Sequence, residues 1–215
     1  MIRQTVRIPA DGRSLRGDLR VPADADGVVV CATGTSGARH AAFESDLRAA
    51  LANRGIGTLV ADLVDVDEAD DRATRGDVRT LADRLDKQLA WLADRPATDG
   101  LDIGLCGRDT GGAAALVVCR ATHRADALAL VNARLDGLDA DAPVPDIPLL
   151  CCLDDAHGYL RARNLALCER AGDSAATCSV TEPDAVPEPV ARWLAARLRD
   201  TSGEPATSRA GQGQI

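Results

Sequence analysis

The sequence has no apolar run near the roughly 20 residues that a membrane-spanning helix needs. Its first residues, MIRQTVRIPADG, lack the long apolar core of a signal peptide. Basic residues are not in excess either, since 25 Lys and Arg stand against 33 Asp and Glu and leave a formal net charge of -8. Nucleic acid and anionic membrane surfaces attract basic proteins, so we expect a cytoplasmic protein that binds neither.

Paired cysteine motifs are also absent. The seven cysteines are an odd number and include no CxxC pair. Four of them lie inside apolar runs, namely Cys31, Cys106, Cys151 and Cys152. We interpret these as small buried hydrophobic residues in a reducing compartment rather than as disulfide partners or metal ligands. No cofactor or metal ion is therefore predicted.

The charged residues are unevenly chosen. Lys87 is the single lysine among the 25 basic residues, and Asp far outnumbers Glu among the 33 acidic ones. An acidic surface of this kind suits a protein that stays soluble at high ionic strength, where salt screens the repulsion between carboxylates. The composition favours a halophilic source, and codon bias alone is the alternative explanation.

The order of apolar segments predicts an α/β fold. Two alternating segments around the turn at Pro9 to Gly12 predict an antiparallel hairpin. Continuous apolar runs, typical of buried parallel strands, follow at 27–33, 56–63, 101–107, 125–132 and 147–153. Helical patterns separate them. We expect one domain over residues 1–200, a doubly wound and mostly parallel sheet with helices on both faces, followed by a disordered tail over 201–215.

A strand, a tight glycine turn and a small-residue helix come together in LDIGLCGRDTGGAAALVV. This unit resembles the nucleophile elbow G-x-S-x-G of the α/β-hydrolase superfamily, with Gly107 and Gly111 as its glycines and Asp109 in the nucleophile position. From about Gly27 to Leu198 the chain resembles small, cap-less dienelactone-hydrolase-like members. The resemblance implies an α/β-hydrolase fold and a hydrolase of small esters or lactones, with Arg108 and Thr110 beside the elbow as oxyanion- or substrate-binding residues.

A carboxylate at the elbow departs from the Ser or Cys that is usual in dienelactone-like proteins. Elsewhere in the superfamily, in haloalkane dehalogenases and epoxide hydrolases, an elbow Asp attacks carbon and forms an ester that a His-activated water cleaves. Asp109 could act in the same way. The alternative is that Asp109 caps the following helix, with its side chain accepting from the amide of Gly111 or Gly112.

Two further loops resemble parts of the same site. The loop after the first parallel strand resembles the family's oxyanion loop, with Thr33 in place of its usual His; its candidate residues are Thr33, Gly34, Thr35, Arg39 and His40. An ordinary glycine-rich turn and a surface His are the alternatives. The run IPLLCCL ends in Asp154 and Asp155, which resemble the acid that orients a catalytic His. We favour Asp155 over Asp154, and His157 follows in the same loop.

The catalytic His expected between the last strand and the last helix is missing from ATCSVTEPDAVPEPVARW. His123 follows the helix after the elbow, so it should lie at the opposite end of the sheet. Two hypotheses follow: a hydrolase that uses Asp109 with Asp155 or Asp154, or an inactive homologue that binds a small ligand or a protein partner. The polar segment 64–76 predicts a solvated acidic loop, because it lacks the glycine and terminal glutamate of a calcium-binding loop.

Overall fold

The computed structural model describes residues 1–33, 38–68 and 70–200. Strands β1 (Ile2–Ala10) and β2 (Arg13–Val21) form the predicted antiparallel hairpin. Its two-residue turn places Asp11 and Gly12 at φ of 51° and 73°, in the left-handed region that such turns require. Alternate residues of both strands are buried, so only one face of the hairpin packs against the core.

The hairpin continues into a sheet of eight strands in the order β1-β2-β4-β3-β5-β6-β7-β8. The strands from β3 onward are parallel, and β2 pairs with β4 in antiparallel fashion. They are β3 (Gly27–Thr33), β4 (Ile56–Ala61), β5 (Asp102–Arg108), β6 (Ala127–Val131), β7 (Leu149–Asp154) and β8 (Ala175–Val180). The prediction of a mostly parallel α/β sheet is confirmed.

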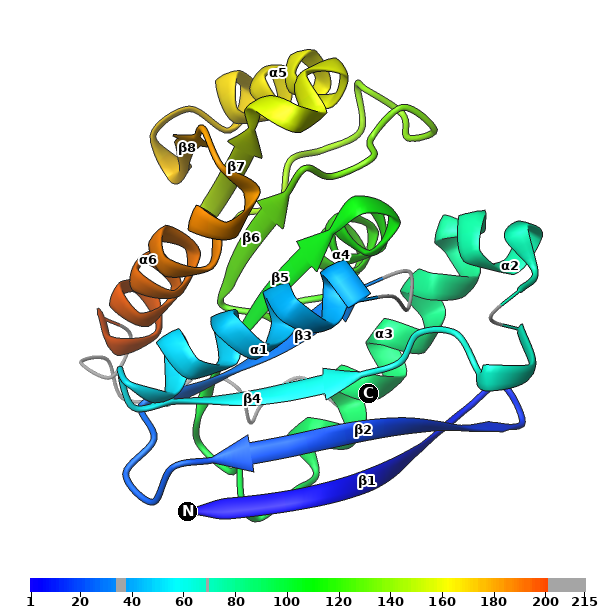
Figure 1. Cartoon of the computed structure of the whole chain (residues 1–215), viewed down its shortest axis with the longest axis vertical. Coiled ribbons are helices and arrows are strands. Elements are labelled where there is room, and N and C mark those ends of the chain that lie inside the picture. The colour runs from blue at the N-terminus through cyan, green and yellow to red at the C-terminus, as the bar shows by residue number, and fades with distance from the viewer. Residues whose placement is uncertain (34–37, 69, 201–215) are drawn as a thin grey trace, which may run out of the picture.

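Helices cover both faces of this sheet (Figure 1). The main helices are α1 (Ala38–Ala52), α3 (Val78–Ala93), α4 (Asp109–Ala121), α5 (Arg161–Ala171) and α6 (Pro187–Asp200). Helices α1 and α6 contribute to one buried cluster, and α3, α4 and α5 contribute to the other. Two apolar layers on opposite faces explain why the parallel strands are apolar along their whole length.

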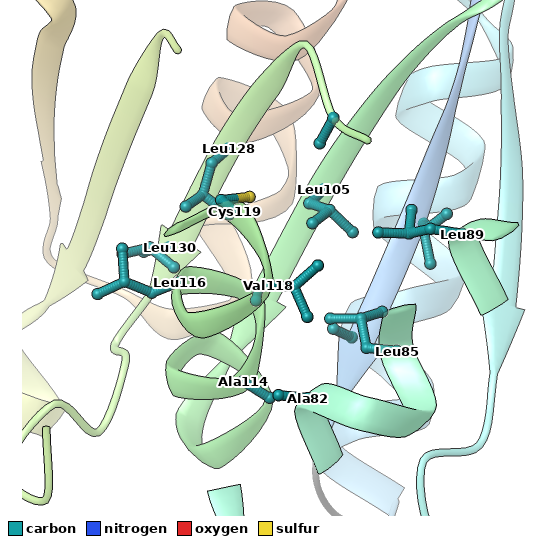
Figure 2. Close-up of a cluster of buried hydrophobic side chains, with 14 of the residues drawn as sticks. Ala82, Leu85, Leu89, Leu105, Ala114, Leu116, Val118, Cys119, Leu128 and Leu130 are labelled. Carbon is teal, nitrogen blue, oxygen red and sulfur yellow. The ribbon is translucent and has the colours of Figure 1, made fainter. Parts of the chain in front are cut away.

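Leucines of α3 carry much of the larger cluster. Leu85 and Leu89 project towards Leu105 of β5 and the small-residue helix α4 (Figure 2). Both leucines are fully buried, and they lie four residues apart on one side of α3. Burial of one such side chain stabilises the fold by roughly 1.5–3 kcal/mol. The alanines of α4 allow this close packing directly behind the elbow.

The segment 64–76 differs from the predicted loop. It contains a short 3-10 turn, η1 (Val66–Glu68), and the five-residue helix α2 (Arg72–Gly76), whose N-cap Asp71 accepts from Ala73 N at 2.9 Å. The buried Arg84 holds the segment against α3, with Nη1 and Nη2 donating to the two carboxylate oxygens of Glu68 at 2.7 and 2.9 Å. This fork-to-fork ion pair explains why an acidic segment packs on the domain.

The cysteines behave as the sequence indicated. All seven are free thiols, and only Cys178 is more than marginally exposed. Among the described residues, no helix is both long and apolar enough to cross a membrane.

Candidate functional site

The elbow lies where the central strand β5 meets helix α4. Asp109 is the first residue of α4 and has a φ of 51°, a left-handed conformation that few non-glycine residues adopt. The amide of Arg134 donates to the Asp109 carbonyl at 3.0 Å and fixes the turn from the loop after β6. The predicted strained turn at the carboxyl end of a central parallel strand is confirmed.

Glycine at position 107 is a steric requirement. A Cβ atom there would lie 2.6 Å from Gly112 Cα and 2.9 Å from Ala115 Cβ, far inside normal contact distance. Gly112 is crowded in turn, because a Cβ atom on it would lie 2.7 Å from Ala133 Cβ. The strand and the helix therefore approach too closely for side chains, which forces the chain to reverse sharply at Asp109.

Asp109 presents its carboxylate beside a guanidinium. Its side chain is 24% exposed, and its Oδ2 lies 3.8 Å from Arg108 Nε. Arg108 is itself nearly buried and lies over the ring of Phe43 at 5.0 Å from the ring centre. The N-cap position of α4 belongs to Arg108, whose side chain makes no capping hydrogen bond. Asp109 therefore lies at the elbow itself, with a left-handed backbone that belongs to the turn.

The structure distinguishes the two acids at the end of β7. Asp154 is 2% exposed, and its Oδ2 accepts from Asn132 Nδ2 at 2.8 Å, while its amide donates to Asn132 Oδ1 at 3.1 Å. Asp155 is exposed at the start of a 3-10 turn, η2 (Asp155–Leu160). The geometry therefore favours Asp154 as the inward acid, whereas the sequence analysis favoured Asp155.

Asn132 is a site residue that the sequence analysis missed. It follows β6 directly, is completely buried, and has a φ of 46°. Its backbone amide donates to the Cys152 carbonyl at 3.0 Å, and this bond connects the loop after β6 to β7. A polar residue at the end of the apolar run ADALALVN was the available signal, because ligand-binding residues in such sheets follow the strands.

Three of the remaining candidates, Thr33, Arg108 and Thr110, lie at the same end of the sheet. Thr33 and Arg108 are register partners at the carboxyl ends of β3 and β5, and Thr110 lies half-buried in the first turn of α4. Gly34 and Thr35 lie outside the described residues. The structure describes only the backbone, and no side-chain position, for Thr33, Arg39, His40 and His157.

His123 does not belong to this site. It is exposed beyond the C-terminal end of α4, a helix of 13 residues that begins at the elbow. At 1.5 Å per residue, this places His123 roughly 20 Å from Asp109. The chain has no His after His157, so the β8–α6 connection offers only Glu182 and Asp184 as ionisable side chains, both exposed.

Thiol or metal chemistry at the elbow finds no support in the residues that can be described. Burial raises the pKa of Cys106 well above its ordinary value, so this thiol remains protonated and cannot serve as a nucleophile. Within the described ranges, no group of three or more His, Cys, Asp or Glu side chains could hold a metal ion.

Solved structures share this architecture over almost the whole chain. A dienelactone hydrolase from Anabaena variabilis superimposes with a TM-score of 0.82 and 25% identity, covering 93% of this chain and 97% of that one. The chain is an α/β-hydrolase-fold protein. The esterase domain of a Rhodothermus marinus protein (TM-score 0.68, 17% identity, 93% and 99% covered) and Est1E from Butyrivibrio proteoclasticus (0.67, 12%, 92% and 97%) support the fold alone.

Sequence comparisons reach less far. No protein-family model matches the chain. Proteins from two strains of Mycobacterium tuberculosis, CDC 1551 and H37Rv, are 35% identical over 129 residues, and their names assign them provisionally as phosphoribosyl transferases. The match spans 60% of this α/β-hydrolase-fold chain but only 29% of each relative's length.

Proposed function

We propose that this α/β-hydrolase-fold protein binds a small ester- or lactone-like molecule at the elbow and does not hydrolyse it by acyl transfer. The observation that carries the proposal is the φ of 51° at Asp109, at the carboxyl end of β5. A left-handed non-glycine residue costs on the order of 1–3 kcal/mol, and such strain persists mainly at functional sites. The fold therefore keeps a site whose reacting group has been replaced.

The residue types argue against acyl transfer. A carboxylate is a weak nucleophile towards an ester carbonyl, and the attack would produce an anhydride that still needs an activated water. In a Ser–His–Asp site the acid orients a His from the loop between the last strand and the last helix, and residues 181–186 of this chain include no His. With His123 at the far end of α4 and no His after position 157, the family's usual general base is lost.

A second function is supported by the accessibility of the Asp109 carboxylate. Its side chain is 24% exposed at the elbow, where a carboxylate oxygen could attack an alkyl carbon and displace a halide or open an epoxide. The resulting ester would release the alcohol only when water attacks its carbonyl and restores the carboxylate. Hydrolysis of carbon electrophiles is therefore the alternative activity.

Phosphoribosyl transfer is not part of the proposal. That activity is named for whole proteins of which this match covers 29%, and the elbow chemistry described above does not require it.

Ligand titration followed by amide NMR tests the proposal. We expect δ-valerolactone and methyl acetate to shift the amides of residues 108–111 saturably, without product formation. Asp155→Ala is the control variant. Asp155 is exposed, so this substitution should leave the ligand-induced shifts at residues 108–111 unchanged. Absence of saturable shifts at the elbow with either ligand would contradict the proposal, and formation of acid and alcohol would favour an active hydrolase.

A further inference from the structure

A second cavity lies away from the elbow, between the C-terminal part of α4 and the connection from β6 to β7, which runs beside α5 (Figure 1). Its volume is ≈ 160 Å³. An apolar cavity of about 150 Å³ is large enough to hold benzene, so this one has room for a single ring or a short branched chain. Arg120 of α4 lines it and, at 1.5 Å per residue along the helix, lies roughly 16 Å from Asp109.

Leucine side chains form one wall of this cavity. Leu135 and Leu138 belong to one turn of the β6–β7 connection, in which the Leu138 amide donates to the Leu135 carbonyl at 3.1 Å. Leu167 adds a third leucine from α5. Because Leu138 is only half-buried, apolar surface remains open to water here. An apolar group that fills the cavity would remove this surface from water, which favours binding.

Arg170 of α5 holds the loop that forms another wall. Its Nη1 donates to the Ala140 carbonyl, and its Nη2 donates to the carbonyls of Asp141 and Ala142 at 3.2 and 2.6 Å. Three bonds from one side chain fix the loop against the helix, so the cavity is formed before any ligand binds. Arg170 therefore shapes the cavity, and its Nη groups are occupied by the loop.

Arg120 differs from Arg170, because its guanidinium forms no hydrogen bond or ion pair with any residue that the structure describes. Its Nε is enclosed, whereas Nη1 and Nη2 remain accessible. Burial lowers the pKa of Arg120 and the positive charge of Arg170 lowers it further, although Asp139 acts in the opposite direction. Two open Nη groups thus lie where an unaccompanied positive charge is disfavoured.

The charges that line the cavity match a monoanion. Arg120, Arg163 and Arg170 contribute three positive charges, and Asp139 and Asp141 contribute two negative ones, so one positive charge remains. The Asp139 carboxylate accepts from the Asp141 amide at 2.9 Å, which keeps it in the loop. A dianion would exceed this balance and would be repelled by both aspartates.

We propose that this cavity binds a small apolar monocarboxylate. The aromatic ring or branched alkyl group lies against the leucines, and the two carboxylate oxygens accept from Nη1 and Nη2 of Arg120. A planar guanidinium matches the two oxygens of a carboxylate through paired, charge-assisted hydrogen bonds. This ligand and this cavity are separate from those proposed for the elbow, so neither proposal depends on the other.

Isothermal titration calorimetry at constant ionic strength tests this site. The probes are benzoate and cyclohexanecarboxylate. Benzamide supplies the ring without the charge, and acetate supplies the charge without the ring. We expect at least one of the two apolar carboxylates to bind at a single site, and at least tenfold more tightly than benzamide and acetate. No saturable binding of either apolar carboxylate, or equally tight binding of benzamide or acetate, would overturn the proposal.

Two matched arginine variants assign the binding to this cavity. Arg120→Gln should weaken binding about tenfold or more, because it removes hydrogen bonds between two charged groups. Its melting temperature without ligand should stay within about 2 °C of the unmodified protein, since Arg120 has no bonded partner to lose among the described residues. Arg192→Gln is the control, an exposed arginine of α6 on the other face of the sheet. Equal weakening by both variants, or none by Arg120→Gln, would contradict the assignment.

A third variant fills the cavity. Ala166 of α5 lines the cavity and is exposed, so Ala166→Trp can place its indole against the leucines without entering the core. We expect this variant to lose binding of both apolar carboxylates while it keeps the melting temperature of the unmodified protein. Carboxylate binding of unchanged affinity in Ala166→Trp would show that the ligand lies elsewhere.

Discussion

Substitution of Gly107 by alanine tests whether the elbow geometry depends on close contact between β5 and α4. The added methyl group would meet Gly112 Cα at 2.6 Å and both Ala115 Cβ and Gly111 O at 2.9 Å. Optimal contacts between carbon atoms are about 3.5–4.0 Å, so the strand and the helix would have to separate by about 1 Å. None of the three atoms belongs to a flexible side chain that could move aside.

The expected cost follows from that geometry. Extra methyl groups in well-packed cores typically cost about 1–3 kcal/mol, and contact with fixed backbone places Gly107→Ala at about 3 kcal/mol. For a domain of this size, each kcal/mol lowers the melting temperature by about 2–4 °C. We therefore expect Gly107→Ala to lower the melting temperature by about 6–12 °C.

Differential scanning calorimetry provides the assay, and Gly137→Ala provides the control. Gly137 is exposed, and a Cβ atom there would meet nothing within 4 Å. The melting temperature of Gly137→Ala should therefore equal that of the unmodified protein or be slightly higher. Amide shifts of residues 109–112 should change in Gly107→Ala alone. A loss of less than about 2 °C would refute the argument from crowding.

Four other substitutions test the acidic residues of the structure. Glu68→Gln should lower the free energy of unfolding by about 1.5–3 kcal/mol near pH 7, because it weakens the partly buried, charge-assisted hydrogen bonds with Arg84. Hydrogen bonds from Arg84 lower the pKa of Glu68, so the stabilisation is present above the ordinary carboxyl pKa and is lost as the pH falls through the lowered pKa. Chemical denaturation between pH 7 and pH 3 should therefore show the unfolding free energies of the unmodified protein and of Glu68→Gln converging. Asp154→Ala should lower the free energy of urea unfolding by about 2 kcal/mol, because it leaves Asn132 Nδ2 without this hydrogen bond. Asp155 is exposed, so Asp155→Ala should change the same quantity by no more than about 0.5 kcal/mol. Asp109→Ser alone should give no aryl esterase activity in a chromogenic assay, since a serine without a general base keeps its proton, and activity should require a second change that supplies His in the region 178–184.

The fold and the elbow could be predicted because their signals are local. Buried parallel strands appear as continuous apolar runs, and the closely spaced glycines of LCGRDTGG mark the crowded turn at Asp109. The short helix α2 was missed because none of its residues is buried, which leaves no apolar periodicity to detect.

The details of the site depend on contacts between distant residues. Asp154 and Asp155 are adjacent, and only the folded chain, in which Asp154 is buried against Asn132 and Asp155 is exposed, shows which carboxylate lies inside. Asn132 acquires its role from a partner 22 residues away.

Turnover of activated aryl esters tests the central claim most directly. Purified protein is mixed with 4-nitrophenyl acetate at low and at molar salt, and release of nitrophenol is compared with buffer and with Asp109→Ala. Because a carboxylate stands at the elbow and no His follows position 157, we expect the same rate for the unmodified protein, for Asp109→Ala and for buffer. Robust hydrolysis by the unmodified protein that Asp109→Ala abolishes would contradict the account.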